Sequence, residues 1–378
     1  MDSDNLSEQQ ISSAIQRILS RIDSTTNSAL SGFPNYAEAD GTWVTSRDGD
    51  WTGGFWVGEL WLSAHTSGGD LETVKSWMKR LQARTHSSTI FRGFLFYYGA
   101  VLGATLLQST EARELAVVGA LELAKDAHPC GIIGLGNAAE EASDVGPCET
   151  SIDGVGGVTG LLSYAAQVTD SSALADLALA HARWHLDHLV REDGSVVQSA
   201  TFDPESGSVT RTYTHKGFAS DSTWARAQAW AMLGATEAAL WIPEHRAEFV
   251  DRARMVADWW LAHVPESGIP VWDFDAPNDG TQEIDTSAAA IAAACLLKLA
   301  ELDRERYVVY HDAAARTVAN LVRNHLTSEV DAEQSGMLVR SCYNHRIGLA
   351  TDNEVIWGSY FLFESLAILQ GRLSALAV

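Results

Sequence analysis

The chain has 378 residues, and 46% of them are hydrophobic, so it has enough apolar side chains to bury a large core. Its formal net charge of −23 at pH 7, from 26 basic and 49 acidic residues, argues against nucleic acid or an anionic membrane surface as its partner, because both require clustered Lys and Arg. No apolar run approaches the roughly 20 residues that a membrane-spanning helix needs.

The first segment, residues 1–21, lacks the basic and apolar regions of a secretory signal, and its isoleucines recur at helical spacing. We therefore expect a cytoplasmic protein. The cysteines are scattered without a C-x-x-C or a metal-binding spacing, at Cys130, Cys148, Cys295 and Cys342. We expect buried free thiols and no metal site.

Helical periodicity recurs along the whole chain, whereas strand signals are scarce. The segments that fit helices are residues 7–31, 54–67, 70–84, 93–108, 110–127, 155–168, 171–192, 222–240, 244–264, 285–302, 304–326 and 354–373. They pair an apolar or alanine-rich helix, such as 287–300, with an amphipathic one, such as 303–323. Six buried helices ringed by six amphipathic ones predict a single all-α domain over residues 1–378, an (α/α)6 barrel. A helical solenoid is the alternative, although no repeat of fixed period is visible.

Five of the six predicted inner helices follow a motif that contains an acidic residue. The motifs are D-G-D-W-T-G-G-F-W (48–56), S-I-D-G-V-G-G (151–157), S-D-S-T-W-A-R-A-Q-A-W (220–230), E-I-D-T-S-A (283–288) and T-D-N-E-V-I-W-G (351–358). In such a barrel all five would face one mouth. For Asp285 and Asp352 we favour a structural interpretation, in which each caps the N-terminus of its helix.

Tryptophans gather at these same helix starts, namely Trp51, Trp56, Trp224, Trp230 and Trp357. Aromatic residues that serve only the core would be scattered along the helices. Aromatic faces beside polar groups in a concave mouth are how a protein holds a sugar ring. The pattern therefore predicts a carbohydrate cleft.

Asp153 is the carboxylate that we expect to carry the chemistry. Three glycines and then an apolar helical run follow it, which is typical of an acid at a helix mouth where a ligand approaches the backbone closely. Longer loops lead to the same mouth: residues 129–153, and residues 192–222 with a hairpin-like pair around F-D-P-E-S-G (202–207). No phosphate-binding G-x-x-x-x-G-K-[ST] motif occurs, so nucleotide binding is not predicted.

A set of motifs spread over residues 51–373 resembles the unsaturated glucuronyl hydrolases, glycoside hydrolase family 88. They are W-T-G-G-F-W-V-G, S-I-D-G-V-G-G, T-F-D-P-E-S-G, T-H-K-G-F-A-S-D-S-T-W-A-R-A-Q-A-W, V-W-D-F-D-A-P, D-T-S-A-A-A-I and V-I-W-G-S-Y-F. The resemblance implies an (α/α)6 barrel that removes a 4,5-unsaturated uronic acid from the non-reducing end of lyase-generated oligosaccharides by hydrating the C4=C5 bond. It implies neither a metal nor a cofactor, and a monomer or homodimer is expected.

The resemblance also assigns site residues. The acid/base aspartate of the family falls on Asp153, and its sugar-binding residues fall on Trp51, Trp224, Arg226 and Trp230, with His215 beside them and Tyr343 on the C-terminal rim. Asp153 would protonate C4 and then accept a proton from the water that attacks C5, with a pKa raised by apolar neighbours.

Arg226 would bind the substrate carboxylate bidentately through its guanidinium group, beside the ring of Trp224 or Trp230. The structural alternative is an ion pair with Asp221 or Asp273.

The sequence departs from the family pattern at several positions. Phe91 stands where the family has a second active-site aspartate, Lys216 replaces a glutamine and Gln198 replaces a histidine, while an aromatic residue expected in 131–137 is missing. We keep Gln198 and Lys216, together with Trp56, as candidate substrate-binding residues. Arg92 is either a further attractant for a carboxylate or sulfate, or a surface residue.

Two other functions fit the sequence. One is an ordinary (α/α)6 glycosidase or a lyase. Its candidate catalytic residues are the carboxylates Asp50, Asp221 and Asp285, or His215 with Tyr213 as a base. The other is a non-catalytic sugar-binding toroid whose active site has decayed, as Phe91 would indicate.

Overall fold

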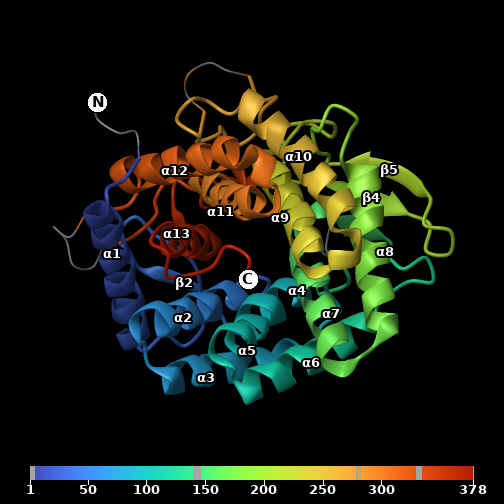
Figure 1. The fold of residues 1–378 in the computed structure, drawn as a ribbon, viewed down its shortest axis with the longest axis horizontal. Helices are drawn as coiled ribbons and strands as arrows, with labels where there is room; N and C mark the ends of the chain where they lie inside the picture. Colours follow the sequence, from blue (N-terminus) through green and yellow to red (C-terminus); the bar gives the residue numbers. More distant parts are fainter. Residues whose placement is uncertain (1–4, 139–145, 278–279, 281, 329–333, 378) are drawn as a thin grey trace.

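Two concentric rings of helices form the protein. The computed structural model describes residues 5–138, 146–277, 280, 282–328 and 334–377. The inner ring consists of α2 (Gly53–Ser67), α4 (Arg92–Phe96) with α5 (Leu102–Leu107), α7 (Val155–Thr169), α9 (Ala225–Trp241), α11 (Thr286–Leu302) and α13 (Ile356–Leu369), as Figure 1 shows. The outer ring consists of α1 (Glu8–Asn27), α3 (Leu71–Arg80), α6 (Thr110–Ala124), α8 (Ser172–Leu189), α10 (Arg246–His263) and α12 (Tyr307–Asn324).

Burial follows the predicted alternation of inner and outer helices. In α11 every residue from Thr286 to Ala300 is buried, because alanine and small side chains let its neighbours approach on all sides. In α1 only one stripe is buried, which includes Ile11, Ile15, Ile18 and Ile22. The (α/α)6 barrel is confirmed, and each of the helical segments expected from the sequence coincides with an observed helix.

Local geometry shifts some helix ends. The segment predicted as 93–108 contains a π-helical turn, Tyr97–Val101, between α4 and α5. The segment predicted to begin at residue 222 begins at Ala225, because Trp224 is extended and pairs with Asp273 as an isolated β-bridge. Short 3₁₀ turns lie between the longer elements, at Leu81–Arg84, Ile152–Gly154, Pro243–His245, Arg304–Arg306 and His345–Ile347.

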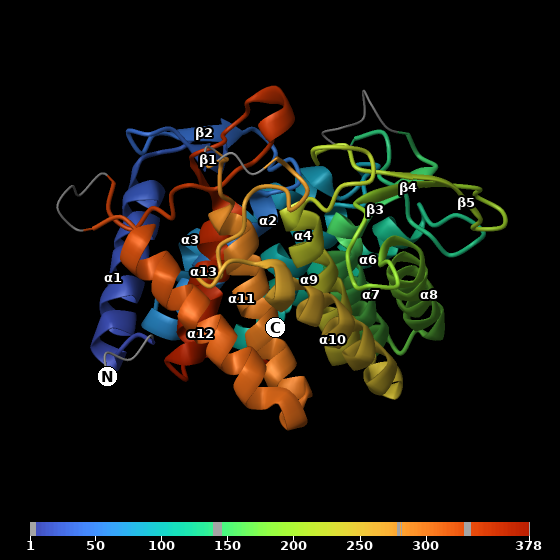
Figure 2. The ribbon, with the colours of Figure 1, turned by 90° about the horizontal axis from the view of Figure 1, so that it is seen from above.

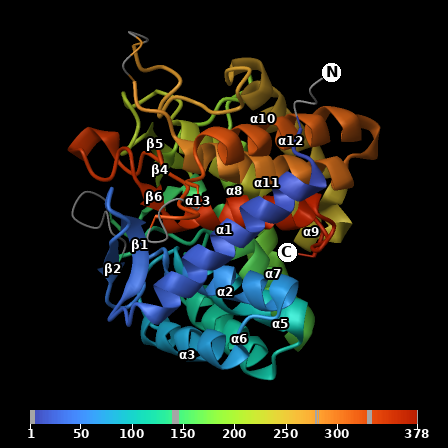
Figure 3. The same ribbon diagram turned by 90° about the vertical axis from the view of Figure 1, so that its left-hand side faces the viewer.

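Two small antiparallel sheets cover one end of the barrel (Figure 2). One has the order β3 (Glu149–Ser151), β4 (Ser199–Phe202) and β5 (Val209–Tyr213), so the predicted hairpin is confirmed. The other has the order β2 (Trp43–Ser46), β1 (Phe33–Ala37) and β6 (Glu354–Val355), which the sequence analysis did not predict. Figure 3 shows this second sheet beside α1. Strand β6 leads directly into α13, and β3 leads into α7 through the 3₁₀ turn Ile152–Gly154, so both strands fix where these inner helices start.

Glycines allow three inner helices to pack backbone against backbone. A Cβ atom at Gly54 of α2 would lie 2.3 Å from the carbonyl oxygen of Phe94 in α4, and one at Gly157 of α7 would lie 2.7 Å from Gly93. Any larger residue at either position would separate the helices. Within the described residues, no helix is both long and apolar enough to cross a bilayer.

Candidate active site

A cavity lies at the end of the barrel where the sheets are found. It holds about 220 Å³ of space, part of which is open to solvent, and is lined by Trp51, Phe91, Asp153, Lys216, Trp224, Arg226 and Trp230. Apart from Phe91, all of these are residues that the sequence analysis assigned to the site. They come from the starts of four inner helices or the loops before them, so the predicted convergence is confirmed for these motifs.

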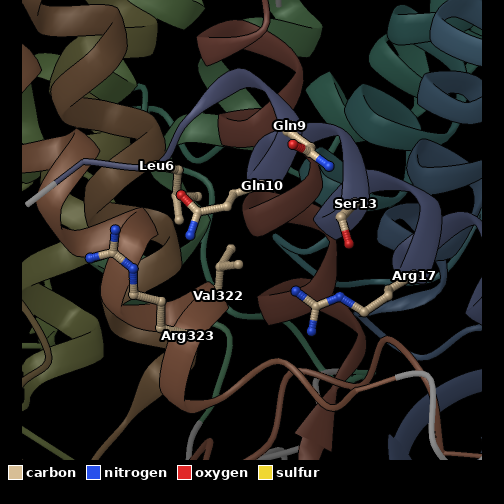
Figure 4. A pocket seen from close by; sticks show the side chains of 7 residues that line it. All are labelled: Leu6, Gln9, Gln10, Ser13, Arg17, Val322 and Arg323. Carbon is tan, nitrogen blue, oxygen red and sulfur yellow. The ribbon is translucent and has the colours of Figure 1, made fainter. Parts of the chain in front are cut away.

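A larger hollow of about 800 Å³ lies elsewhere, between α1 and α12 (Figure 4). The described residues that line it include no acidic or aromatic side chain. Its arginines hold the ends of the helices: Arg17 donates to the carbonyl oxygens of Leu326 and Thr327, and Arg323 donates to that of Asn5. The described lining of this hollow therefore offers no carboxylate for acid–base chemistry, whereas that of the smaller cavity does.

Asp153 sits on the 3₁₀ turn between β3 and α7, and its side chain is buried, with 5% of the residue exposed. Its backbone N–H donates to the hydroxyl of Ser151, which fixes the turn. Its Oδ2 atom accepts a hydrogen bond of 2.8 Å from Nε2 of Gln198. The carboxyl group is thus held by a neutral amide in a largely aromatic cavity.

Gln198 connects Asp153 to the loop on the other side of the site. Its Oε1 atom accepts from the hydroxyl of Thr214 at 2.8 Å and from the backbone N–H groups of His215 and Lys216, both at 3.2 Å. These three donors fix the orientation of the amide, so Nε2 must face Asp153. Gln198 is fully buried and positions two cavity residues without lining the cavity itself.

His215 takes part in the same network. Its Nε2 atom lies 3.3 Å from Nε2 of Gln198, and its Nδ1 atom lies 3.1 Å from the hydroxyl of Ser199. Because the amide nitrogen of Gln198 can only donate, Nε2 of His215 is the acceptor. His215 therefore connects Gln198 to Ser199 of β4.

Arg226, in the first turn of α9, is buried against polar groups of the protein itself. Its Nη1 atom donates to the carboxylate of Asp285 and, at 2.6 Å, to the carbonyl oxygen of Cys342, while Nη2 donates to the carbonyl oxygen of Tyr343. The guanidinium carbon lies 4.3 Å from the centroid of Trp224. The structural alternative named Asp221 or Asp273 as the partner of Arg226, and this was wrong, because the partner is Asp285.

The two predicted helix caps have different outcomes. Asp285 is the N-cap of α11 and accepts from the N–H groups of Ser287 and Ala288, so that prediction is confirmed. The prediction for Asp352 was wrong, because α13 is capped by Val355 and Asp352 is an exposed residue 3.5 Å from Arg340. The ion pair of Asp285 with Arg226 was missed, since nothing local in either motif signals it.

Aromatic rings form the wall of the cavity. The indole N–H of Trp51 donates to the hydroxyl of Tyr343 at 2.9 Å, and the ring of Trp51 lies 4.6 Å from that of Trp357 and 5.8 Å from that of Phe91. Trp56 has to be removed from the predicted site. Its ring packs at a right angle to Trp77 of α3, at 5.8 Å, on the side of α2 that faces the outer ring.

The two residues after Ile90 lie in different surroundings. Phe91 does line the cavity, at the position where the family pattern has an acid. Both interpretations of Arg92 were wrong: it is 2% exposed, pairs with Asp126 and donates to the carbonyl oxygens of Thr85 and Thr89. Its guanidinium group therefore stabilises the approach to α4 and does not attract a ligand.

The glycines after Asp153 also have a structural role. Cβ atoms at Gly154, Gly156 and Gly157 would collide with Ile90, Leu233 and Gly93, at 2.7, 2.9 and 2.7 Å. These glycines serve the packing of α7 against neighbouring helices, so the expected approach of a ligand to their backbone was the wrong explanation.

Asp153 is the one carboxylate among the described residues that line the cavity. Asp221 is exposed, Asp50 lies outside the lining with a pKa raised by burial, and Asp285 is paired with Arg226. Tyr213, the candidate partner of His215 in a lyase, does not line the cavity either. No group of three or more His, Cys, Asp or Glu in the described part of the chain is arranged to bind a metal ion.

No protein-family model matches the chain. It is 32% identical over 351 residues to the unsaturated glucuronyl hydrolase of Bacillus sp. strain GL1, covering 89% of this chain and 91% of that protein. It is 26% identical to the unsaturated chondroitin disaccharide hydrolase of Streptococcus pyogenes serotype M1, covering 96% and 92%. The crystal structure of the Bacillus sp. GL1 enzyme superimposes with a TM-score of 0.85 at 30% identity, covering 95% of this chain and 96% of that one.

Proposed function

The chain belongs to the unsaturated glucuronyl hydrolases, glycoside hydrolase family 88, and we propose that Asp153 is the acid and base of its reaction. It is a hydrolase that removes a 4,5-unsaturated uronic acid from the non-reducing end of an oligosaccharide by hydrating the C4=C5 vinyl ether. The observation that carries the assignment of Asp153 is its position as the one carboxylate in the described lining of an aromatic cavity.

The reaction requires one group that first gives and then takes a proton. Protonated Asp153 donates to C4 of the sugar, which leaves an oxocarbenium-like centre at C5. The carboxylate then accepts a proton from the water that adds to C5, and the resulting hemiketal opens and expels the remaining saccharide. The hydrogen bond from Gln198 to Oδ2 holds the carboxyl group in one orientation through both steps.

The remaining site residues bind the sugar. The rings of Trp51, Trp224 and Trp230 offer apolar faces to the pyranose, and Tyr343 fixes the ring of Trp51 through its hydroxyl. Gln198 and His215 position the loop that carries Lys216.

The whole chain, residues 1–378, acts as one catalytic domain, as a monomer or homodimer, without metal or cofactor. A cytoplasmic location agrees with its four free thiols.

The test is the change Asp153→Asn, assayed on unsaturated disaccharides produced by lyases from glycosaminoglycans, ulvan, glucuronan and pectin. Loss of the ultraviolet absorbance of the conjugated enol ether reports hydration. We expect the wild type to remove this absorbance on at least one substrate and the variant to be slower by roughly 1,000-fold or more, with an unchanged circular dichroism spectrum.

Asp352→Asn is the matched control, because it changes an exposed aspartate away from the cavity and should leave the rate unaltered. A lyase would create the absorbance, and an ordinary glycosidase would release sugar without changing it. Binding without any product, with equal affinity in the Asp153→Asn variant, would identify a non-catalytic sugar-binding protein. Retention of more than a small fraction of activity by that variant would exclude Asp153.

A further inference from the structure

A second pocket lies at the end of the barrel opposite the active-site cavity. Helices α7 and α9 both start at the cavity, with Asp153 just before α7 and Trp224 just before α9, and the last turns of both helices line this pocket together with the start of α8. Because α7 has 15 residues, about 22 Å of helix separates its two ends. The pocket holds about 690 Å³ of space, part of which is open to solvent, and it shares no lining residue with the cavity.

Trp241, the last residue of α9, presents an aromatic ring to this pocket. Its indole N–H donates to the hydroxyl of Tyr97 at 2.9 Å and to the carboxylate of Glu237 at 3.1 Å, and both of these groups are buried. The ring of Tyr164 packs nearly at a right angle to it, with the centroids 6.0 Å apart. Trp241 itself is half-buried and lines the pocket. Its ring is therefore held in place yet accessible, which suits stacking on the apolar face of a ligand.

A buried hydroxyl group on the pocket side of α7 is left without a partner. Ser163 is 4% exposed, and its Oγ atom makes no hydrogen bond within the described part of the chain. Ser163 lies on the same face of α7 as Ala166 and Gln167, three and four residues further on, and all three line the pocket. An unpaired buried hydroxyl costs stability, and a ligand in the pocket that bonds to it would remove that cost.

The remaining lining groups indicate what kind of ligand fits. Asp170 and Glu244 are exposed carboxylates, and Gln167 offers an amide. None of the described lining residues is basic, and Arg246, at the start of α10, donates instead to the carbonyl oxygen of Ala239. The C-terminal ends of α7 and α9 add partial negative charge, which the N-terminal end of α8 offsets only in part. An anionic ligand is therefore disfavoured, whereas a neutral one rich in hydroxyl groups can donate to the carboxylates and accept from the amide.

We infer that this pocket binds a neutral saccharide, as a second sugar site separate from the catalytic one. Trp241 stacks on the apolar face of the pyranose ring, while Ser163, Asp170 and Gln167 bond to its hydroxyl groups. Binding there keeps the enzyme on a saccharide between turnovers, which raises the local concentration of substrate ends. The inference does not depend on the role proposed for Asp153.

Isothermal titration calorimetry with cellobiose, lactose and N,N′-diacetylchitobiose tests the inference. We expect the wild type to bind at least one of these sugars, and Asp170→Asn to bind it roughly 10-fold or more weakly, because a charged acceptor is lost. Asn also tolerates the left-handed backbone of this position, where φ is 53°. Ser163→Ala should weaken binding by roughly 3- to 10-fold without lowering the melting temperature of the free protein, since the hydroxyl makes no hydrogen bond within the described residues. Both variants should turn over an unsaturated disaccharide at the wild-type rate.

Asp176→Asn is the matched control, since it removes the same charge from an exposed position of α8 that does not line the pocket. Trp241 is left unchanged, because its N–H also bonds two buried groups. The inference would be overturned by a wild type that binds none of the three sugars, by undiminished binding in Asp170→Asn and Ser163→Ala, or by an equal weakening in Asp176→Asn. A lower melting temperature of free Ser163→Ala would also overturn it, because the hydroxyl would then serve the fold. None of these outcomes bears on Asp153, which is tested by the enol-ether absorbance.

Discussion

Gln198 offers the sharpest test of how the active site is held together. The residue is fully buried, and its Oε1 atom accepts from Thr214, His215 and Lys216. Gln198→Leu keeps a similar volume but removes both the acceptor and the donor. The hydroxyl of Thr214 can rotate to another acceptor, whereas the two backbone N–H groups cannot.

The two backbone N–H groups that lose their acceptor determine the expected loss of stability. A buried donor without an acceptor costs about 1 to 3 kcal/mol, so the free energy of unfolding should fall by about 2 to 6 kcal/mol. Turnover should fall as well, because Asp153 loses its partner at Oδ2 and the loop of Lys216 loses its anchor. Gln198→Glu separates the loss of stability from the loss of turnover, since a carboxylate still accepts from the two backbone N–H groups but places a like charge beside Asp153.

Urea unfolding followed by the fluorescence of the 13 tryptophans measures the stability, and the enol-ether absorbance measures turnover. The Glu variant should regain part of the stability as the pH falls, because two adjacent carboxyl groups raise the pKa of one another and come to share a proton. Gln167→Leu, on the exposed face of α7, is the control. A Gln198→Leu protein with wild-type stability and rate would refute the network described above.

Two further predictions concern buried charge. Burial lowers the pKa of His185 to about 4, against about 6.5 in the unfolded chain, so stability should be lost as the pH falls from about 6.5 towards 4, by about 3 kcal/mol. The His185→Gln variant can still bond Thr150 but does not titrate. Its free energy of unfolding, measured in urea across this pH range, should therefore fall by about 3 kcal/mol less than that of the wild type. An equal fall in both proteins would contradict this prediction. Lys298→Met should cost about 3 to 5 kcal/mol in a thermal or urea melt, because it leaves Glu237 and Glu364, 2.8 and 3.0 Å from the ammonium group, as uncompensated buried carboxylates. Adding Glu364→Gln should recover part of that loss, and a fully stable Lys298→Met protein would show that these carboxylates are protonated in the fold.

The sequence predicted the helices because helix formation and burial are read over a few turns of chain. The alanine run of residues 287–300 can pack on all sides, so it predicts an inner helix whatever surrounds it. The strands Phe33–Ala37 and Trp43–Ser46 pair with each other, yet they were not predicted, because strands of four or five residues carry little local signal. The second partner of Phe33–Ala37 is Glu354–Val355, at the far end of the chain, and only folding brings these two strands together.

The sequence by itself determined the (α/α)6 class, predicted that acidic and aromatic motifs converge at one mouth, and indicated Asp153 as the candidate acid and base. Tertiary structure decided which of these residues touch. Trp51 and Trp56 belong to one motif, yet they have different surroundings. Trp56 is in the first turn of α2 and packs against Trp77, whereas Trp51 precedes the helix and lines the cavity.

The surroundings of Arg226 were decided in the same way. Sequence alone made Arg226 the natural partner of a carboxylate in the substrate, but folding brings it against Asp285, 59 residues away along the chain. The reason is physical: a buried guanidinium group must find its acceptors wherever the fold places them, and these are fixed by long-range contacts rather than by local pattern.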